Sequence, residues 1–122
     1  MALARLAAVA LDCSDPRPLA EFWASLTGGE IVRSNDDHCI IRTDTLHLAA
    51  VRVPHYQRPS WPDGPVPKQI HLDLAVSDLD AAAAEAVRLG AEQSPHQPEP
   101  ALWRVLLDPA GHPFCLSTQM PD

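Results

Sequence analysis

The sequence predicts an α+β fold made of two βαβββ modules, because the same order of elements occurs twice along the chain. In each half an apolar strand runs into a helix cap, a helix closed by glycine follows, and three short strands complete the unit. Setting Ser14-Asp15 over Ser77-Asp78 aligns the halves at an offset of 63 residues and places Leu11 on Leu74. Such an internal repeat decides the fold before any single element does. We expect one face of each sheet to pack under its helix and the other faces to form a cupped mixed sheet.

The modules are assigned to residues 1–53 and 69–122, joined by a proline-rich connector over residues 54–68, all within one structural domain. Five of the thirteen prolines fall in this connector, which therefore cannot pair continuously in a sheet. At 122 residues and 46% hydrophobic composition the chain is long and apolar enough to fold without staples. Tyr56 and Trp61 within the connector are large amphipathic rings that require a surface to pack on.

The net charge argues against two classes of binding partner, and the cysteines indicate the compartment. A net charge of −7 argues against nucleic acid and against an anionic membrane surface. Three cysteines are an odd number without metal-ligand spacing, which indicates free thiols and a reducing, cytoplasmic compartment. The apolar run from residue 6 to 11 is too short for a membrane span and reads as a buried strand.

The first module begins with a strand over residues 6–13. Asp15 is a good N-cap, Pro16 suits the first helical position, and Gly28-Gly29 ends a helix over residues 16–27. Phe22 and Trp23 on this helix are expected to be core or dimer contacts. Strands over residues 30–33, 38–42 and 46–53 follow, separated by polar turns.

The second module repeats this order. A strand over residues 69–76 leads to a cap in which Ser77 and Asp80 have capping-box spacing. An alanine-rich helix over residues 79–89 ends at Gly90, and strands are expected over 91–94, 102–107 and 113–118.

His71 and Asp73 lie two residues apart in a predicted strand and therefore share a face, opposite the apolar side chains of Ile70 and Leu72. One interpretation is a pair that lines a cavity and works as an acid/base or ligand-orienting unit. The other is a structural histidine, hydrogen-bonded in a half-buried strand.

The chain resembles the vicinal oxygen chelate superfamily, the glyoxalase/bleomycin resistance/dioxygenase fold, and within it the glyoxalase-like domain proteins. The residues that carry the resemblance are His71-Leu72-Asp73-Leu74, Ser77-Asp78-Leu79-Asp80, Trp103-Arg104-Val105, Pro59-Ser60-Trp61-Pro62 and the ending Asp108-Pro109-Ala110-Gly111-His112-Pro113-Phe114-Cys115-Leu116. The resemblance implies a homodimer and a ligand cup.

The resemblance also implies four metal-ligand positions, one in the first and one in the last strand of each module. They fall on His71, Cys115, Ala8 and Val51, and the last two cannot ligate a metal. One imidazole and one thiol lack the oxygen ligands of a hard cation, and zinc would need a further ligand, for which His47 is a candidate. No metal or other cofactor is therefore assigned, and a divalent metal is disfavoured.

Six further residues are candidate ligand contacts, and all but Trp103 have an alternative role. His47 lines the cup or an ordinary sheet face, and Trp61 lines the pocket or anchors the connector. Trp103 is expected in the pocket, Cys115 is a small thiol facing the cup rather than a nucleophile, and His112 touches the ligand or caps the last hairpin. Arg104 pairs an anionic ligand or sits at the surface.

Three functions follow from these observations. The leading hypothesis is a cytoplasmic protein that binds a small organic molecule in the cup, with a degenerate metal site. The second is a lyase or isomerase that uses His71 as general base, assisted by Asp73 or His112, or as ligand of a divalent metal. The third is a non-catalytic interaction module whose cup is filled.

Overall fold

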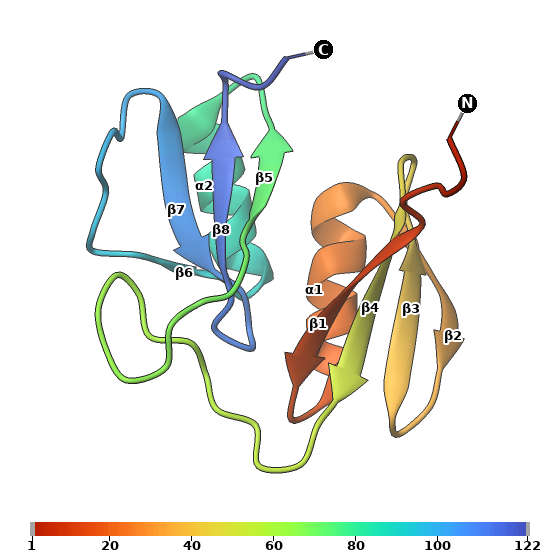
Figure 1. Ribbon diagram of the computed structural model, residues 1–122. Helices are drawn as coiled ribbons and strands as arrows, with labels where there is room; N and C mark the ends of the chain where they lie inside the picture. Colours follow the sequence, from red (N-terminus) through yellow and green to blue (C-terminus); the bar gives the residue numbers. More distant parts are fainter. Residues whose placement is uncertain (1, 122) are drawn as a thin grey trace. The chain divides into compact units, whose positions relative to one another are not determined.

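The computed structural model describes residues 2–121 and consists of two compact units, one ending at Tyr56 and one beginning at Gln57 (Figure 1). The boundary falls inside the predicted connector. The second part of the connector belongs to the second unit, where Ser60 forms a parallel bridge with Pro67. The assignment of both units to one structural domain stays a prediction.

The first unit is a four-stranded mixed sheet with one helix on one face (Figure 1). The sheet order is β1-β4-β3-β2, with β1 parallel to β4 and the other pairs antiparallel. The elements are β1 (Ala8–Cys13), α1 (Pro16–Thr27), β2 (Glu30–Ser34), β3 (His38–Arg42) and β4 (His47–Arg52).

The second unit repeats this topology. Its order is β5-β8-β7-β6, again with the first pair parallel and the others antiparallel. The elements are β5 (Leu72–Ala75), α2 (Leu79–Leu89), β6 (Glu92–Gln93), β7 (Trp103–Leu107) and β8 (Pro113–Ser117). The two βαβββ modules read from the sequence are therefore confirmed as the architecture of the chain.

Each unit has its own core between helix and sheet. In the first, Phe22 and Trp23 of α1 are 2% exposed and meet edge to face, with ring centroids 5.4 Å apart. Phe22 and Trp23 were expected to be core or dimer contacts, and they lie in the core. In the second, Leu106, Phe114 and Leu116 are at most 1% exposed and face α2, which contributes small alanines. The face of this second sheet away from α2 is thereby left for other contacts.

The caps were predicted in part. Asp15 is the N-cap of α1, although its side chain accepts no capping hydrogen bond, and Gly28 ends the helix with φ 72°. The predicted capping box of Ser77 and Asp80 is wrong. The N-cap of α2 is Asp78, whose Oδ1 accepts from the backbone N–H of Ala81 at 3.0 Å. A carboxylate three residues before a free amide is the stronger acceptor, and Asp80 is engaged elsewhere.

The strand predicted over residues 69–76 is shorter in the structure, because β5 pairs with β8 only from Leu72 onward. Ile70 lies outside the sheet and is 57% exposed, so its predicted place on the apolar face is wrong. Within β5, Leu72 and Leu74 are less exposed than Asp73 and Ala75, as the alternation predicted. Among the described residues, no helix is long and apolar enough to cross a membrane.

Candidate functional site

The floor of a pocket is the face of the second sheet that turns away from α2. The strand register places Asp73 opposite Cys115 and Cys115 opposite Val105, which forms one row across three strands. A second row, two residues along, joins Ser117 to Trp103. Because side chains two apart share a face, both rows point to the same side of the sheet.

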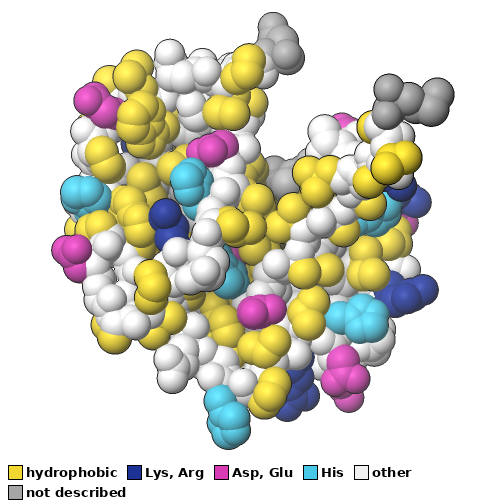
Figure 2. All heavy atoms as spheres, viewed as in Figure 1, with side chains coloured by type: hydrophobic (Ala, Val, Ile, Leu, Met, Phe, Trp, Pro, Cys, Tyr) yellow, Lys and Arg dark blue, Asp and Glu magenta, His cyan; other side chains and the backbone are white. Residues whose placement is uncertain are grey.

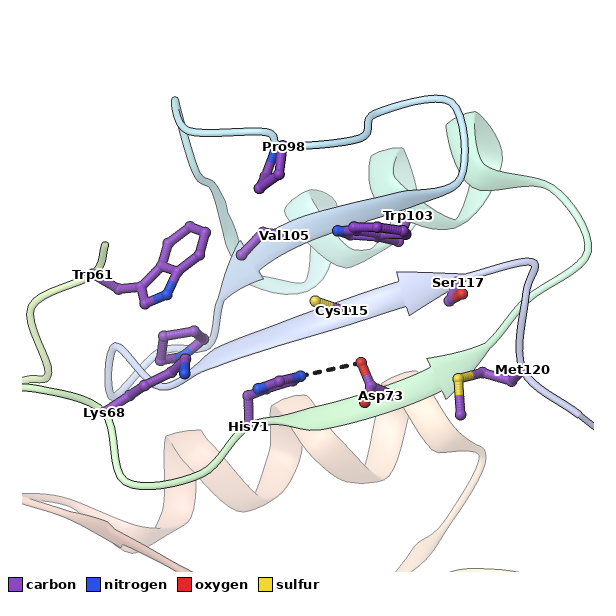
Figure 3. A pocket seen from close by; sticks show the side chains of 11 residues that line it. Trp61, Lys68, His71, Asp73, Pro98, Trp103, Val105, Cys115, Ser117 and Met120 are labelled. Atoms are coloured by element: carbon purple, nitrogen blue, oxygen red, sulfur yellow. Dashed lines mark ion pairs between the residues drawn. The ribbon is translucent and has the colours of Figure 1, made fainter. Parts of the chain in front are cut away.

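The walls come from segments outside the sheet (Figure 3). Trp61 and Lys68 belong to the connector, Pro98 to the loop between β6 and β7, and Met120 to the segment after β8. Together with the floor they enclose a cavity of about 390 Å³. This volume lies in the range of small-molecule sites.

His71, Asp73 and Cys115 form a polar cluster in the pocket. Nε2 of His71 lies 3.3 Å from Oδ1 of Asp73, and both side chains are partly exposed, at 38% and 40%. The strand spacing alone did not guarantee this contact. Burial raises the pKa of the Cys115 thiol to about 11, and the nearby Asp73 carboxylate adds to the shift by its charge and by accepting a hydrogen bond. Cys115 is therefore a neutral thiol near neutral pH, which opposes a nucleophilic role.

The donor atoms of this cluster do not match the metal site that the resemblance implies. The ligand atoms of His71, Asp73 and Cys115 all lie within 4.8 Å of one another. They offer one nitrogen, one oxygen and one sulfur, which does not suit a hard cation such as Mn²⁺ or Mg²⁺. Ala8 in β1 and Val51 in β4 have no ligating side chain. The residues therefore do not fit the four-ligand site, and only a borderline cation such as zinc accepts the donors present.

The structure brings five of the predicted residues together at the pocket. Those at the pocket are Trp61, His71, Asp73, Trp103 and Cys115. Trp61 also packs against His96, with ring centroids 5.2 Å apart, so it anchors the connector as well as lining the pocket.

His112 lies in the last hairpin and is not among the described residues that line the pocket. Its backbone N–H donates to Oδ1 of Asp108 at 2.9 Å, and its carbonyl accepts from the Asp108 N–H at 3.0 Å. This geometry favours the turn role over ligand contact. His47 lies half-buried in β4 of the first unit, paired in register with Ala8 and Arg42. Its predicted ligand role stays a prediction.

Arg104 points away from the pocket. Its guanidinium donates to Oδ1 of Asp80 on α2 at 2.8 Å and to the Pro100 carbonyl at 2.6 Å. Of the two roles expected for it, the structure shows an ion pair at the surface beside α2.

Sequence reasoning missed six residues that line the pocket: Lys68, Pro98, Val105, Pro113, Ser117 and Met120. Val105, Pro113 and Ser117 could have been found, because they share a strand face with Trp103 or Cys115. Lys68 could also have been singled out from the sequence, because it is the single lysine of the chain and precedes His71 by three residues. Pro98 and Met120 depend on the paths of irregular segments, for which no periodicity exists.

Comparison with known proteins agrees with this architecture. A family model described as "Glyoxalase-like domain" matches residues 8–117. The fosfomycin resistance protein FosX from Mesorhizobium loti is similar in structure, with TM-score 0.72 and 15% identity, covering 98% of this chain and 94% of that one. No curated protein matches the sequence.

Two further solved structures are similar. A glyoxalase-related enzyme from Fulvimarina pelagi has TM-score 0.69 and 19% identity, covering 94% of this chain and 88% of that one. A bleomycin-binding protein from bleomycin-producing Streptomyces verticillus, solved with copper(II)-bleomycin, has TM-score 0.64 and 22% identity, covering 98% and 100%. These likenesses show the fold, and the family match over nearly the whole length shows that the chain belongs to the glyoxalase-like domain family of the vicinal oxygen chelate superfamily.

Proposed function

We propose that this protein binds a small, largely apolar organic molecule in the pocket of the second unit, and that binding does not depend on the superfamily's metal. The observation that carries the proposal is the cavity of about 390 Å³ between Trp61 and Trp103. Two indole rings supply large apolar area and N–H donors, while a few polar groups fix orientation. One structural neighbour, the bleomycin-binding protein, is named for binding a small molecule.

The proposal includes a degenerate metal site, supported by Ala8 and Val51 at two of the four ligand positions and by the donor set of the remaining cluster. Elemental analysis of purified, dialysed protein tests this part. Nickel, zinc or iron retained at one equivalent would overturn it.

Trp103 provides the test of binding. The neutral two-ring compound 2-naphthamide is the probe, measured by isothermal titration calorimetry. Replacing Trp103 with Ala should weaken its binding about tenfold, because one aromatic stacking surface is worth about 1–3 kcal/mol. Leu102→Ala is the matched control, since Leu102 is adjacent, 39% exposed and not among the lining residues. No binding to the unmodified protein, or equal binding to protein and Trp103→Ala, would contradict the proposal.

A second candidate is an enzyme in which His71 is the general base and Asp73 orients its ring. The 3.3 Å contact between the two side chains at the pocket floor favours it. A positioned base can contribute about 10²–10⁴-fold to a rate. Proton NMR of 2-acetylnaphthalene in D₂O measures exchange of its methyl protons. The candidate predicts exchange that is accelerated by the protein and lost in His71→Gln, while the probe still binds; equal exchange rates with both proteins would exclude it.

The cavity beside His71 gives no support to a filled cup, on which an interaction-module function depends. The homodimer and the cytoplasmic location are kept as proposals from the resemblance and from the free cysteines. Light scattering of the purified protein measures the first directly.

A further inference from the structure

We infer that the natural ligand is an aromatic anion, such as an aryl carboxylate, whose negative group is bound by Lys68 at one end of the pocket. The inference deepens the proposed function and rests on it. It adds the chemical class of the ligand and a residue that selects for it.

The pocket has two distinct ends. Lys68 precedes β5 by a few residues, and Trp61 lies in the same connector, so both flank the ends at which β5 and the parallel β8 begin. Trp103 and Ser117 form a row near the end of β8, and Met120 follows them. Figure 3 shows this separation, with Lys68 and Trp61 at one side and Trp103, Ser117 and Met120 at the other. A ligand that spans the cavity therefore meets a cation at one end and an apolar aromatic surface at the other.

Lys68 is a cation in the lining of the pocket with no ion-pair partner among the described residues. Among the described residues its ammonium group takes part in no ion pair or hydrogen bond that would neutralise it, although it is only partly exposed. The other charged groups of the pocket have partners within the site: Asp73 accepts from Cys115 and contacts His71. The carboxylate is thus already engaged, and Lys68 is left to bind an anion.

The position of this charge within the chain strengthens the argument. The protein carries a net charge of −7, and its other basic side chains are all arginines. The single lysine nevertheless lies in the wall of the apolar pocket. Figure 2 shows, over the second unit, a basic side chain and histidines set among hydrophobic side chains. A cation that is partly buried among such neighbours binds an anion more tightly than a fully hydrated one.

The rest of the lining selects a flat apolar body. Trp61 and Trp103 present rings, Pro98 and Pro113 present flat pyrrolidines, and Met120 adapts to the shape of what it covers. An aliphatic anion would pair with Lys68 but would not stack on these surfaces. A neutral aromatic compound would stack on them but would not pair with Lys68. An aromatic anion uses both.

The test compares two probes of equal size that differ in charge, 2-naphthoate and 2-naphthamide, by isothermal titration calorimetry. The unmodified protein should bind the carboxylate about tenfold more tightly, since a charge-assisted hydrogen bond to a partly exposed amine is worth about 1.5 kcal/mol. Lys68→Gln should bind both probes equally. Arg88→Gln removes the same charge from the outer side of α2, where Arg88 pairs with Glu85, and should keep the preference. The preference should shrink as salt is added.

A chemical readout checks the contact itself. Because Lys68 is the only lysine, acetylation by an amine-selective reagent reports on it alone, with the α-amino group as internal reference. The carboxylate should slow acetylation of Lys68 several-fold, and the amide should slow it less. Equal binding of both probes to the unmodified protein, with Trp103→Ala weakening both, would overturn the inference and leave the proposed function standing. Failure of both probes to bind would overturn the two together.

Discussion

Native Cys115 should react with iodoacetamide about a hundredfold more slowly than an ordinary exposed thiol at about pH 8. Alkylation requires the thiolate, and the pKa of Cys115 is raised from an ordinary value of 9.0 to about 11, which lowers the thiolate fraction about a hundredfold. Partial burial is the largest cause, followed by the charge of Asp73 and its hydrogen bond from the thiol. Cys13 and Cys39 are at most 1% exposed and should stay unmodified in the native state.

The measurement is mass spectrometry of peptides after timed labelling, with the same peptide from unfolded protein as the reference rate. Asp73→Asn should accelerate labelling about tenfold, because it removes the carboxylate charge but leaves the burial. Lys68→Gln should slow it, because the Lys68 ammonium lowers the pKa of the thiol. A native rate equal to the unfolded one, or no effect of Asp73→Asn, would show that the carboxylate does not govern this thiol.

The same shift makes stability depend on pH in the alkaline range. Because the folded pKa lies above the unfolded one, the native state holds a proton between pH 9.0 and about 11 that the unfolded chain has released. The contribution is fully present below this window, and the free energy of unfolding falls as pH rises through it. In urea titrations, the free energy of unfolding of the protein minus that of Cys115→Ala should be constant below this window and fall as pH rises through it.

Replacing Asp108 with Ala should lower the free energy of unfolding by about 3 kcal/mol, the largest stability effect we expect near the site. Asp108 is 2% exposed, and its Oδ1 accepts from the backbone N–H groups of Ala110 at 3.0 Å and His112 at 2.9 Å. Removing the carboxylate leaves two amides of the hairpin without this acceptor, each at a cost of about 1–3 kcal/mol. The hairpin leads directly into β8, which carries Cys115 to the pocket floor.

Urea unfolding monitored by circular dichroism measures the effect, and Asp108→Asn is the matched variant. The amide keeps an oxygen at the same place, so it should cost less than half as much as Asp108→Ala. A loss below about 1 kcal/mol for Asp108→Ala, or equal losses for the two variants, would mean that the hydrogen bonds at Oδ1 do not hold the turn.

The sequence by itself determined the architecture. Apolar periodicity, the proline that begins α1 and the glycines after both helices are local signals. Because the same order occurs in both halves, each half supports the assignment of the other. Strand alternation also placed His71 and Asp73 on one face, and the family resemblance placed Cys115 in the cup. The sequence predicts a helix cap less well where two neighbouring side chains can both accept the capping hydrogen bond. At the start of α2 the cap is Asp78 and not Ser77. The predicted start of β5 was wrong because pairing with β8, a strand far along the chain, decides where β5 begins.

The tertiary structure decided which of the candidate residues form a site. The contact between His71 and Asp73 depends on rotamers, and the neutral state of Cys115 depends on burial and on Asp73 across the strand pair. Neither follows from spacing, because desolvation and charge pairing act between segments far apart in the chain. The same holds for Lys68, which the sequence shows only as a solitary lysine. The path of the connector places Lys68 in the wall of an apolar pocket. In that place we propose that its charge selects anionic ligands.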